Sequence, residues 1–175
     1  YISRTPGKGT FVIRPKLSRG RTRLTSFSED MQARGLTATS QIVSFECVPT
    51  GDRLSGLLML DRDTSLLHIK RVRLAAGRKV AVHDAYLTYT DIVRDELEAV
   101  GSLYTLLERK GVRMVEADET LEAIVADKEL AELLDIKRGA PLLKASRLSW
   151  DCSSTLIEYV QAIYRADFYR YTVRL

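Results

Sequence analysis

The sequence predicts a mixed α/β fold of the α+β kind, in which helices flank a largely antiparallel sheet. Segments with the two-residue period of strands outnumber helical segments, and the two kinds are interleaved along the chain. Two pairs of apolar strands are each joined by a short turn, at residues 76–77 and 151–154, as in antiparallel hairpins. With 175 residues, of which 45% are hydrophobic, the chain can bury one substantial core.

Local start and stop signals define the predicted elements. Ser26 and Glu29 fit a capping box that opens a helix, and Gly35 would end that helix. In chain order, we expect a turn and short strand within 1–12, a helix at 26–35, a strand at 40–48, a helix at 52–58, strands at 66–75 and 79–89, a helix capped by Asp91 and ending at Val100, a helix from Ser102 to Gly111, a strand at 113–125, a helix capped by Asp127, and strands at 142–150 and 156–165.

The net charge of +4 is unevenly distributed. Residues 1–24 contain seven basic residues and no acid, so the remaining 20 basic and 23 acidic residues give the rest of the chain a charge of −3. A basic segment of this kind is typical either of phosphate neutralisation or of a solvated linker. The body of the chain is not a basic nucleic-acid surface.

The sequence shows no membrane-spanning run and no signal peptide, which favours a cytoplasmic protein. Cys47 and Cys152 are far apart and lack metal-ligand spacing, so we expect two reduced and buried thiols. There is no hydrolase elbow, zinc-protease motif, phosphate-binding loop or dinucleotide fingerprint. The sequence therefore predicts no metal, no cofactor and no enzyme of these common classes.

A lone carboxylate lies in an apolar alternating strand near the end of the chain. In residues 156–164 the two-residue period places Glu158 on one face with apolar side chains. Upstream, Arg71 and Arg73 follow Leu67 and Ile69 on one strand face, where their planar guanidinium groups can bind a phosphate or carboxylate. These charges suggest a small-molecule pocket, although an ion pair between Glu158 and either arginine is the structural alternative.

Two helix starts carry further candidate groups. Phe27 and Ser28 follow the capping residue of the first helix, and Ser102 and Tyr104 lie at the start of a later one. Free backbone N–H groups at helix starts favour anions. Ordinary capping, with Phe27 packed as a hydrophobic staple, is the alternative interpretation.

Five segments in order resemble one family: residues 6–12 (PGKGTFV), 24–31 (LTSFSEDM), 71–73 (RVR), 102–108 (SLYTLLE) and 157–170 (IEYVQAIYRADFYR). The first resembles the end of the wing in a GntR-type winged helix-turn-helix, and the others resemble the UTRA effector-binding domain of the HutC subfamily. The resemblance implies a chorismate-lyase-like fold. It divides the chain into a wing remnant at 1–13, a basic linker at 14–24 and a UTRA domain at 25–175.

The resemblance also implies functional roles. The chain would be part of a homodimeric bacterial transcription regulator, a repressor or an activator, whose small anionic effector, a sugar phosphate or a carboxylate, changes operator affinity. Operator DNA would be bound only through an N-terminal domain that precedes this sequence. The expected effector-binding residues are Phe27, Ser28, Arg71, Arg73, His83, Ser102, Tyr104, Glu158 and Tyr164, and the DNA-proximal wing residues are Arg4, Lys8, Gly9 and Thr10.

His83 stands where relatives that bind sugar phosphates often carry a glutamate, which argues against an amino-sugar phosphate. By strand parity, His68 faces away from Arg71, and Asp84 faces away from His83, so neither forms a catalytic pair there. Two alternative functions remain at this point: a chorismate-lyase-like enzyme, and a non-sensing dimerisation module in which the pocket has become packed core.

Overall fold

A six-stranded antiparallel sheet forms the centre of the fold in a computed structural model that describes residues 2–5, 9–12, 17–19 and 24–171. The strand order is β4-β5-β6-β9-β8-β7, and every neighbouring pair is antiparallel. The two predicted hairpins, β5–β6 and β8–β9, are confirmed. The strands are β4 (Ala38–Pro49), β5 (Ser65–Ala75), β6 (Arg78–Leu87), β7 (Glu116–Val125), β8 (Pro141–Trp150) and β9 (Leu156–Arg165).

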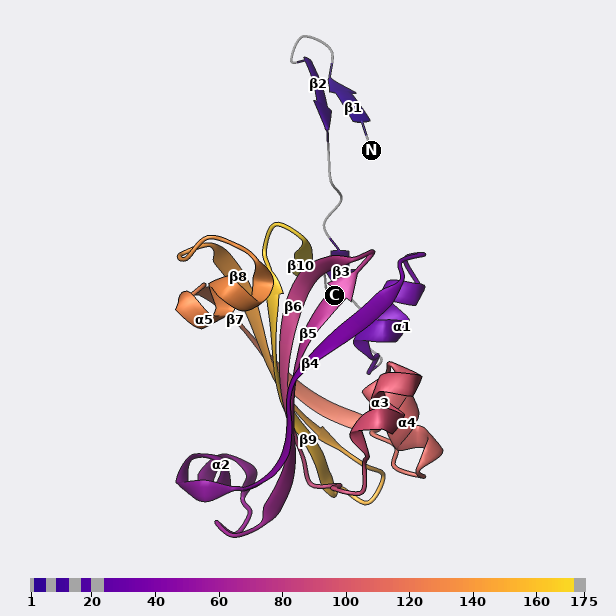
Figure 1. Cartoon of the computed structure of the whole chain (residues 1–175), viewed down its shortest axis with the longest axis vertical. Helices are drawn as coiled ribbons and strands as arrows, with labels where there is room; N and C mark the ends of the chain where they lie inside the picture. Colours follow the sequence, from indigo (N-terminus) through magenta and orange to yellow (C-terminus); the bar gives the residue numbers. More distant parts are fainter. Residues whose placement is uncertain (1, 6–8, 13–16, 20–23, 172–175) are drawn as a thin grey trace.

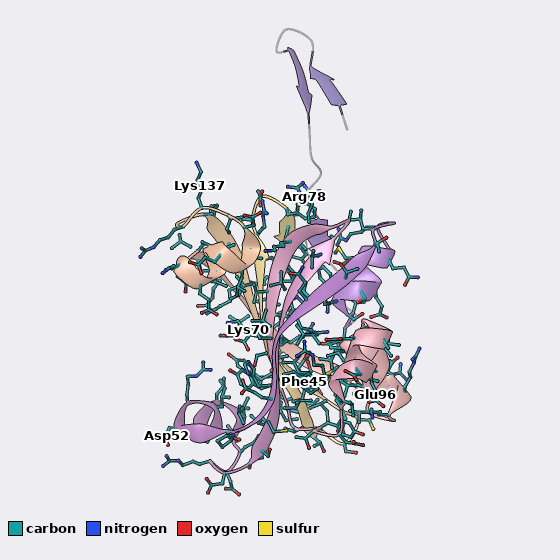
Figure 2. The ribbon with its side chains drawn as sticks, in the orientation of Figure 1. Phe45, Asp52, Lys70, Arg78, Glu96 and Lys137 are labelled. Atoms are coloured by element: carbon teal, nitrogen blue, oxygen red, sulfur yellow. The ribbon has the colours of Figure 1, made fainter. Side chains whose placement is uncertain are left out.

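Helices cover both faces of this sheet (Figure 1). They are α1 (Phe27–Gln32), α2 (Gly51–Leu58), α3 (Arg94–Val100), α4 (Leu103–Arg109) and α5 (Lys128–Leu134). Figure 1 shows α1, α3 and α4 on one side and α2 and α5 on the other. Glu96 on α3 and Asp52 on α2 accordingly lie on opposite sides in Figure 2. The predicted α+β class is confirmed.

The helices pack through apolar side chains at helical spacing. Leu103, Leu106 and Leu107 of α4 are buried against Ile69 and Leu87 of the sheet. On the opposite face, α5 packs against a separate cluster that contains Val72, Val82 and Leu142. Because side chains alternate along a strand, β5 supplies one set of residues to each layer.

Two short strand pairs lie outside the main sheet. β1 (Ile2–Thr5) and β2 (Gly9–Val12) pair as an antiparallel hairpin that includes the wing residues Arg4, Gly9 and Thr10, whereas Lys8 lies outside the described residues. Within the predicted linker, β3 (Leu17–Arg19) pairs in parallel with β10 (Tyr169–Tyr171). Residues 13–16 and 20–23 lie outside the described part, and the predicted domain boundaries stay predictions.

Three local predictions are wrong. Asp91 does not cap α3, which begins three residues later, after Val93, whose backbone N–H lies 3.4 Å from the Glu96 carboxylate. β7 begins at Glu116 rather than at residue 113. Cys47 and Cys152 are free, as predicted, but both are exposed, because burial depends on which strand face a neighbouring layer covers. Among the described residues, no helix has the length and apolar character needed to cross a membrane.

Candidate effector-binding site

A small chamber lies between the sheet and the helices α1 and α4. Its volume is about 30 Å³. The predicted residues Phe27, Ser28, Arg71, Arg73, His83, Ser102, Tyr104 and Glu158 line it, together with Ser26, Leu103, Arg147 and Val160. Eight of the nine predicted effector-binding residues, which are spread over more than a hundred positions, are thus brought to one place. The ninth, Tyr164, is not among the lining residues.

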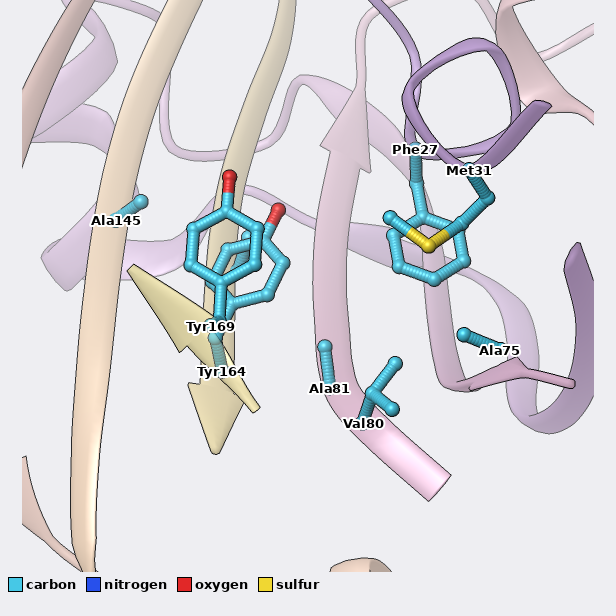
Figure 3. Packing of buried hydrophobic residues seen from close by; sticks show 9 residues of the cluster. Phe27, Met31, Ala75, Val80, Ala81, Ala145, Tyr164 and Tyr169 are labelled. Atoms are coloured by element: carbon cyan, nitrogen blue, oxygen red, sulfur yellow. The ribbon is translucent and has the colours of Figure 1, made fainter. Parts of the chain in front are cut away.

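Tyr164 belongs to an aromatic cluster beside the chamber. Its ring stacks on that of Tyr169 with centroids 4.1 Å apart, and the edge of His83 meets it at 5.6 Å. Figure 3 shows the two tyrosine rings stacked, with Phe27 and Met31 of α1 nearby. His83 also meets Phe27 edge to face at 5.6 Å. Tyr164 therefore packs against His83, and His83 in turn lines the chamber.

Arg73 is held by α1. Its guanidinium carbon lies 4.5 Å from the centre of the Phe27 ring, and Nη2 donates a hydrogen bond of 3.1 Å to Ser28 Oγ. Only 2% of the residue is exposed, and its Nε has no hydrogen-bond partner among the described residues. Burial holds the pKa of Arg73 well below its ordinary value, the charge of Arg71 lowers it further, and Tyr164 opposes the shift.

Arg71 is a buried cation with unused donors. Only 4% of the residue is exposed, and within the described part of the chain neither Nε nor Nη1 has a hydrogen-bond partner. Burial lowers the pKa of Arg71 from its ordinary value to about 10, while the nearby Glu158 and Tyr104 oppose that shift. The group is still charged at neutral pH. A buried donor that lacks a hydrogen-bond partner costs free energy.

Glu158 is held by Tyr104 and Arg147. The Tyr104 hydroxyl donates to Glu158 Oε2 at 2.8 Å, and Arg147 Nη2 lies 3.4 Å from the same oxygen and contacts the Tyr104 hydroxyl. A second carboxylate, that of Glu119, lies 3.8 Å from Arg147 Nη1. Only 2% of Glu158 is exposed, so this network keeps the carboxylate compensated in a buried place.

The alternative interpretation, an ion pair between Glu158 and Arg71 or Arg73, is therefore wrong, because neither arginine is in contact with the carboxylate. Arg147 is the partner, and sequence reasoning missed it. The signal was weak but present, because Arg147 shares its face of β8 with the buried residues Ala145 and Ser149. Only the pairing of β8 with β9, which sets Arg147 opposite Val160 and Ser149 opposite Glu158, makes the arginine a neighbour of the carboxylate.

The two helix starts have capping roles. Ser26 Oγ accepts from the Glu29 backbone N–H at 3.1 Å, and the Glu29 carboxylate accepts from the Ser26 N–H at 2.7 Å, which completes the predicted capping box. Ser102 Oγ lies 3.4 Å from the Thr105 backbone nitrogen and caps α4. Ser26 and Ser102 also line the chamber, so both capped helix starts lie at the site.

The polar residues on the opposite face are separate from the chamber. His68 Nε2 lies 2.6 Å from Asp84 Oδ1, and the His68 ring stacks on Tyr86. The predicted separation of His68 from Arg71 and of Asp84 from His83 is confirmed. Among the described residues, no three His, Cys, Asp or Glu side chains gather as metal ligands.

The chain matches the UTRA domain over residues 33–170. It is 31% identical over 172 residues to the HTH-type transcriptional repressor NagR of Bacillus subtilis, which covers 97% of this chain and 71% of that protein. The chain belongs to the UTRA domain family. It is also 26% identical over 168 residues to the repressor PhnF of Mycolicibacterium smegmatis, covering 95% of this chain and 68% of that protein.

Solved structures show the same fold. PhnF from Mycobacterium smegmatis matches with a TM-score of 0.85 at 24% identity, over 99% of this chain and 77% of that one. The effector domain of PhnF matches with a TM-score of 0.78 at 23% identity, over 90% of this chain and 98% of that one. The sequence relatives of this UTRA domain are transcriptional repressors. It is therefore a domain of a GntR/HutC-type regulator and not a chorismate-lyase-like enzyme.

Proposed function

We propose that this UTRA domain binds a small anionic metabolite, a sugar phosphate or a carboxylate, in the chamber that contains Arg71 and Arg73. The observation that carries the proposal is the pair of buried guanidinium groups, whose Nε atoms and, in Arg71, Nη1 have no hydrogen-bond partner among the described residues. This chain is also 29% identical to a GntR-family regulator from Bordetella bronchiseptica, whose solved structure is that of its ligand-binding domain.

Charge explains the preference for an anion. Arg71 and Arg73 lie close enough for the charge of Arg71 to lower the pKa of Arg73, so each raises the cost of burying the other. An anion between them reverses that repulsion and supplies acceptors to the unused donors. At the other end of the chamber, Glu158 would accept hydrogen bonds from hydroxyl or amine groups of the ligand.

Binding requires the chamber to open. A volume of about 30 Å³ holds one or two water molecules, whereas pockets for small organic ligands are usually about 300 Å³ or more. The hydrogen bond from Arg73 to Ser28 ties α1 to the sheet. We infer that the ligand accepts the hydrogen bond of Arg73 in place of Ser28, and that α1 shifts as a result.

The shift would reach the DNA-binding domain through the segment that precedes α1. In the proposed cytoplasmic homodimer, the ligand favours one arrangement of the two DNA-binding domains. It works only through a difference in affinity between the operator-bound and the released form. If the ligand had equal affinity for both forms of the full-length dimer, this mechanism would be wrong.

The small chamber favours one second candidate, a dimerisation module that senses no ligand. In that case Arg71 and Glu158 are parts of a packed core. The two candidates differ in what the arginines do for stability, because a core residue stabilises the fold whereas an anion receptor costs stability until its ligand is bound.

A thermal-shift panel separates these candidates. Phosphorylated sugars, carboxylate metabolites and amino-acid breakdown products are added at millimolar concentration, and a compound that binds the folded form raises its melting temperature. Arg73→Met and Glu158→Gln should each weaken the response at least about tenfold in concentration, since each removes hydrogen bonds to a charged group. Arg62→Met, which removes an exposed arginine paired with Asp52, is the matched control and should leave the response unchanged.

A compound that acts on the parent and the control but not on the two chamber variants would support the proposal. No response from any compound, together with strong destabilisation by both chamber variants, would favour the non-sensing module.

A further inference from the structure

A second hollow adjoins the chamber at Arg71. It is a cleft of about 540 Å³ lined by residues of the edge strand β4, of α3 and by Arg71 of β5. Its lining residues are Ala38, Thr39, Ser40, Gln41, Ile42, Arg71, Leu97, Glu98 and Gly101. Arg71 therefore forms a wall shared by the chamber and the cleft. Unlike the chamber, the cleft is large enough for a small metabolite.

Buried donors of two residues line the cleft without a hydrogen-bond partner in the described part of the chain. They are Nε and Nη1 of Arg71 and the hydroxyl of Ser40. The pairing of β4 with β5 sets Ser40 opposite Arg73 and Ile42 opposite Arg71, so the hydroxyl and the guanidinium come from neighbouring strands. Unsatisfied buried donors are rare in native proteins, and each calls for an explanation.

The charge of the cleft suits an anion. Its single acidic lining residue, Glu98, is already paired with Arg94, whose Nε lies 2.9 Å from the carboxylate. The remaining lining residues apart from Arg71 are uncharged. Arg71 therefore dominates the local field, and the apolar side chains of Ile42 and Leu97 offer contacts to the uncharged part of a ligand.

We propose that the cleft between β4 and α3 is a second anion subsite, in which Arg71 and Ser40 bind the phosphate or carboxylate group of a small metabolite. The inference goes beyond the proposed function, because this subsite already has room for a small metabolite and does not require the chamber to expand. Both sites share Arg71, so an anion in one reduces the attraction for an anion in the other. The cleft thereby lets a second anion modulate the effector response.

Inorganic phosphate is the simplest probe. It is titrated into isotopically labelled protein at fixed pH and ionic strength, and backbone amide shifts are followed by NMR. We expect saturable shifts at residues 38–42 and 97–101. Ser40→Ala should weaken the apparent affinity at these amides about tenfold, because a hydrogen bond to a charged group is lost.

Ser149→Ala is the matched control. Ser149 also carries a buried hydroxyl without a hydrogen-bond partner in the described part of the chain, but it is not among the lining residues of the cleft. Both variants remove an unsatisfied hydroxyl, so neither should lower the melting temperature. A purely structural role for Ser40 therefore predicts identical phosphate binding in the two variants.

Shifts that do not saturate, or an affinity unchanged by Ser40→Ala, would overturn the inference. Glu158→Gln separates it from the proposed function, since this variant alters the chamber but not the lining of the cleft. Retained phosphate shifts at 38–42 in that variant support the cleft subsite even if no compound of the thermal-shift panel binds the chamber. Loss of those shifts in Glu158→Gln, with Ser40→Ala silent, would place the anion in the chamber alone.

Discussion

Replacement of Arg71 by methionine should stabilise the ligand-free protein while it abolishes anion binding. Methionine keeps most of the length of the apolar stem and removes a buried charge whose Nε and Nη1 have no hydrogen-bond partner among the described residues. Replacing a buried charge by an apolar residue of similar volume is often neutral or stabilising. A core role for Arg71 predicts the opposite sign.

The pKa of Arg71 gives the size of the effect. The fall of this pKa from its ordinary value to about 10 measures how much the folded protein disfavours the charged form, with the attraction of Glu158 already included. At about 1.4 kcal/mol for each tenfold change in proton affinity, this corresponds to about 3 kcal/mol as an upper bound. Because methionine fills the space imperfectly, we expect a gain of about 1–3 kcal/mol in the free energy of unfolding.

Urea unfolding at pH 7 and fixed protein concentration measures this gain. The pH dependence supplies an independent check. Between pH 10 and 12.5 the unfolded chain binds more protons at Arg71 than the folded protein does, so the wild type gains stability as the pH rises through this range. The advantage of Arg71→Met is therefore complete below about pH 9 and narrows above it.

A loss of about 3–5 kcal/mol in Arg71→Met would refute this reasoning, because that is the usual cost of removing one partner from a buried ion pair. Arg71 would then be a structural partner of Glu158, and the chamber would be core. The exposed Arg62→Met serves as control, and its free energy of unfolding should change by less than about 1 kcal/mol.

Two further variants test the geometry around the site. Arg147→Met leaves the buried Glu158 without its arginine and should cost about 3–5 kcal/mol in urea unfolding, whereas Lys144→Met, which removes a more exposed cross-strand pair on the same strand, should cost less than about 1 kcal/mol. Equal losses of stability in the two variants would mean that burial does not strengthen the Arg147–Glu158 pair. Ser26→Ala breaks the capping box with Glu29 and should lower the free energy of unfolding by about 1 kcal/mol, and Ser26→Asp should restore most of it. If the free energy of unfolding of Ser26→Asp were as low as that of Ser26→Ala, the capping role of Ser26 would be contradicted.

The local elements of this fold could be predicted because their signals lie within a few residues. The capping residues Ser26, Ser102 and Asp127 begin α1, α4 and α5 as expected. Where a cap is made by other means the prediction is wrong, as at the start of α3 after Val93. Propensity and spacing thus determine where an element lies, with small errors at its ends.

Strand parity and the family resemblance together predicted most residues of the candidate site. Parity alone places Arg71 and Arg73 on one face and His68 on the other, since the side-chain period of a strand is two. The resemblance added Ser28, Ser102 and Tyr104, which no periodic pattern connects to the arginines. Burial of the two thiols was predicted wrongly, because exposure depends on how distant layers cover each residue.

The sequence by itself determined the hairpins, most of the helix starts, the shared strand face of Arg71 and Arg73 and, through its resemblance, the family. Only the tertiary structure decided that β9 also pairs with β6, and which register the β8–β9 hairpin takes, which brings Arg147 to Glu158 in a buried network. It also decided that the chamber is small and that Arg71 lines a second cleft. These features follow from strand register and from the packing of segments distant in the chain, and no local pattern encodes either of them.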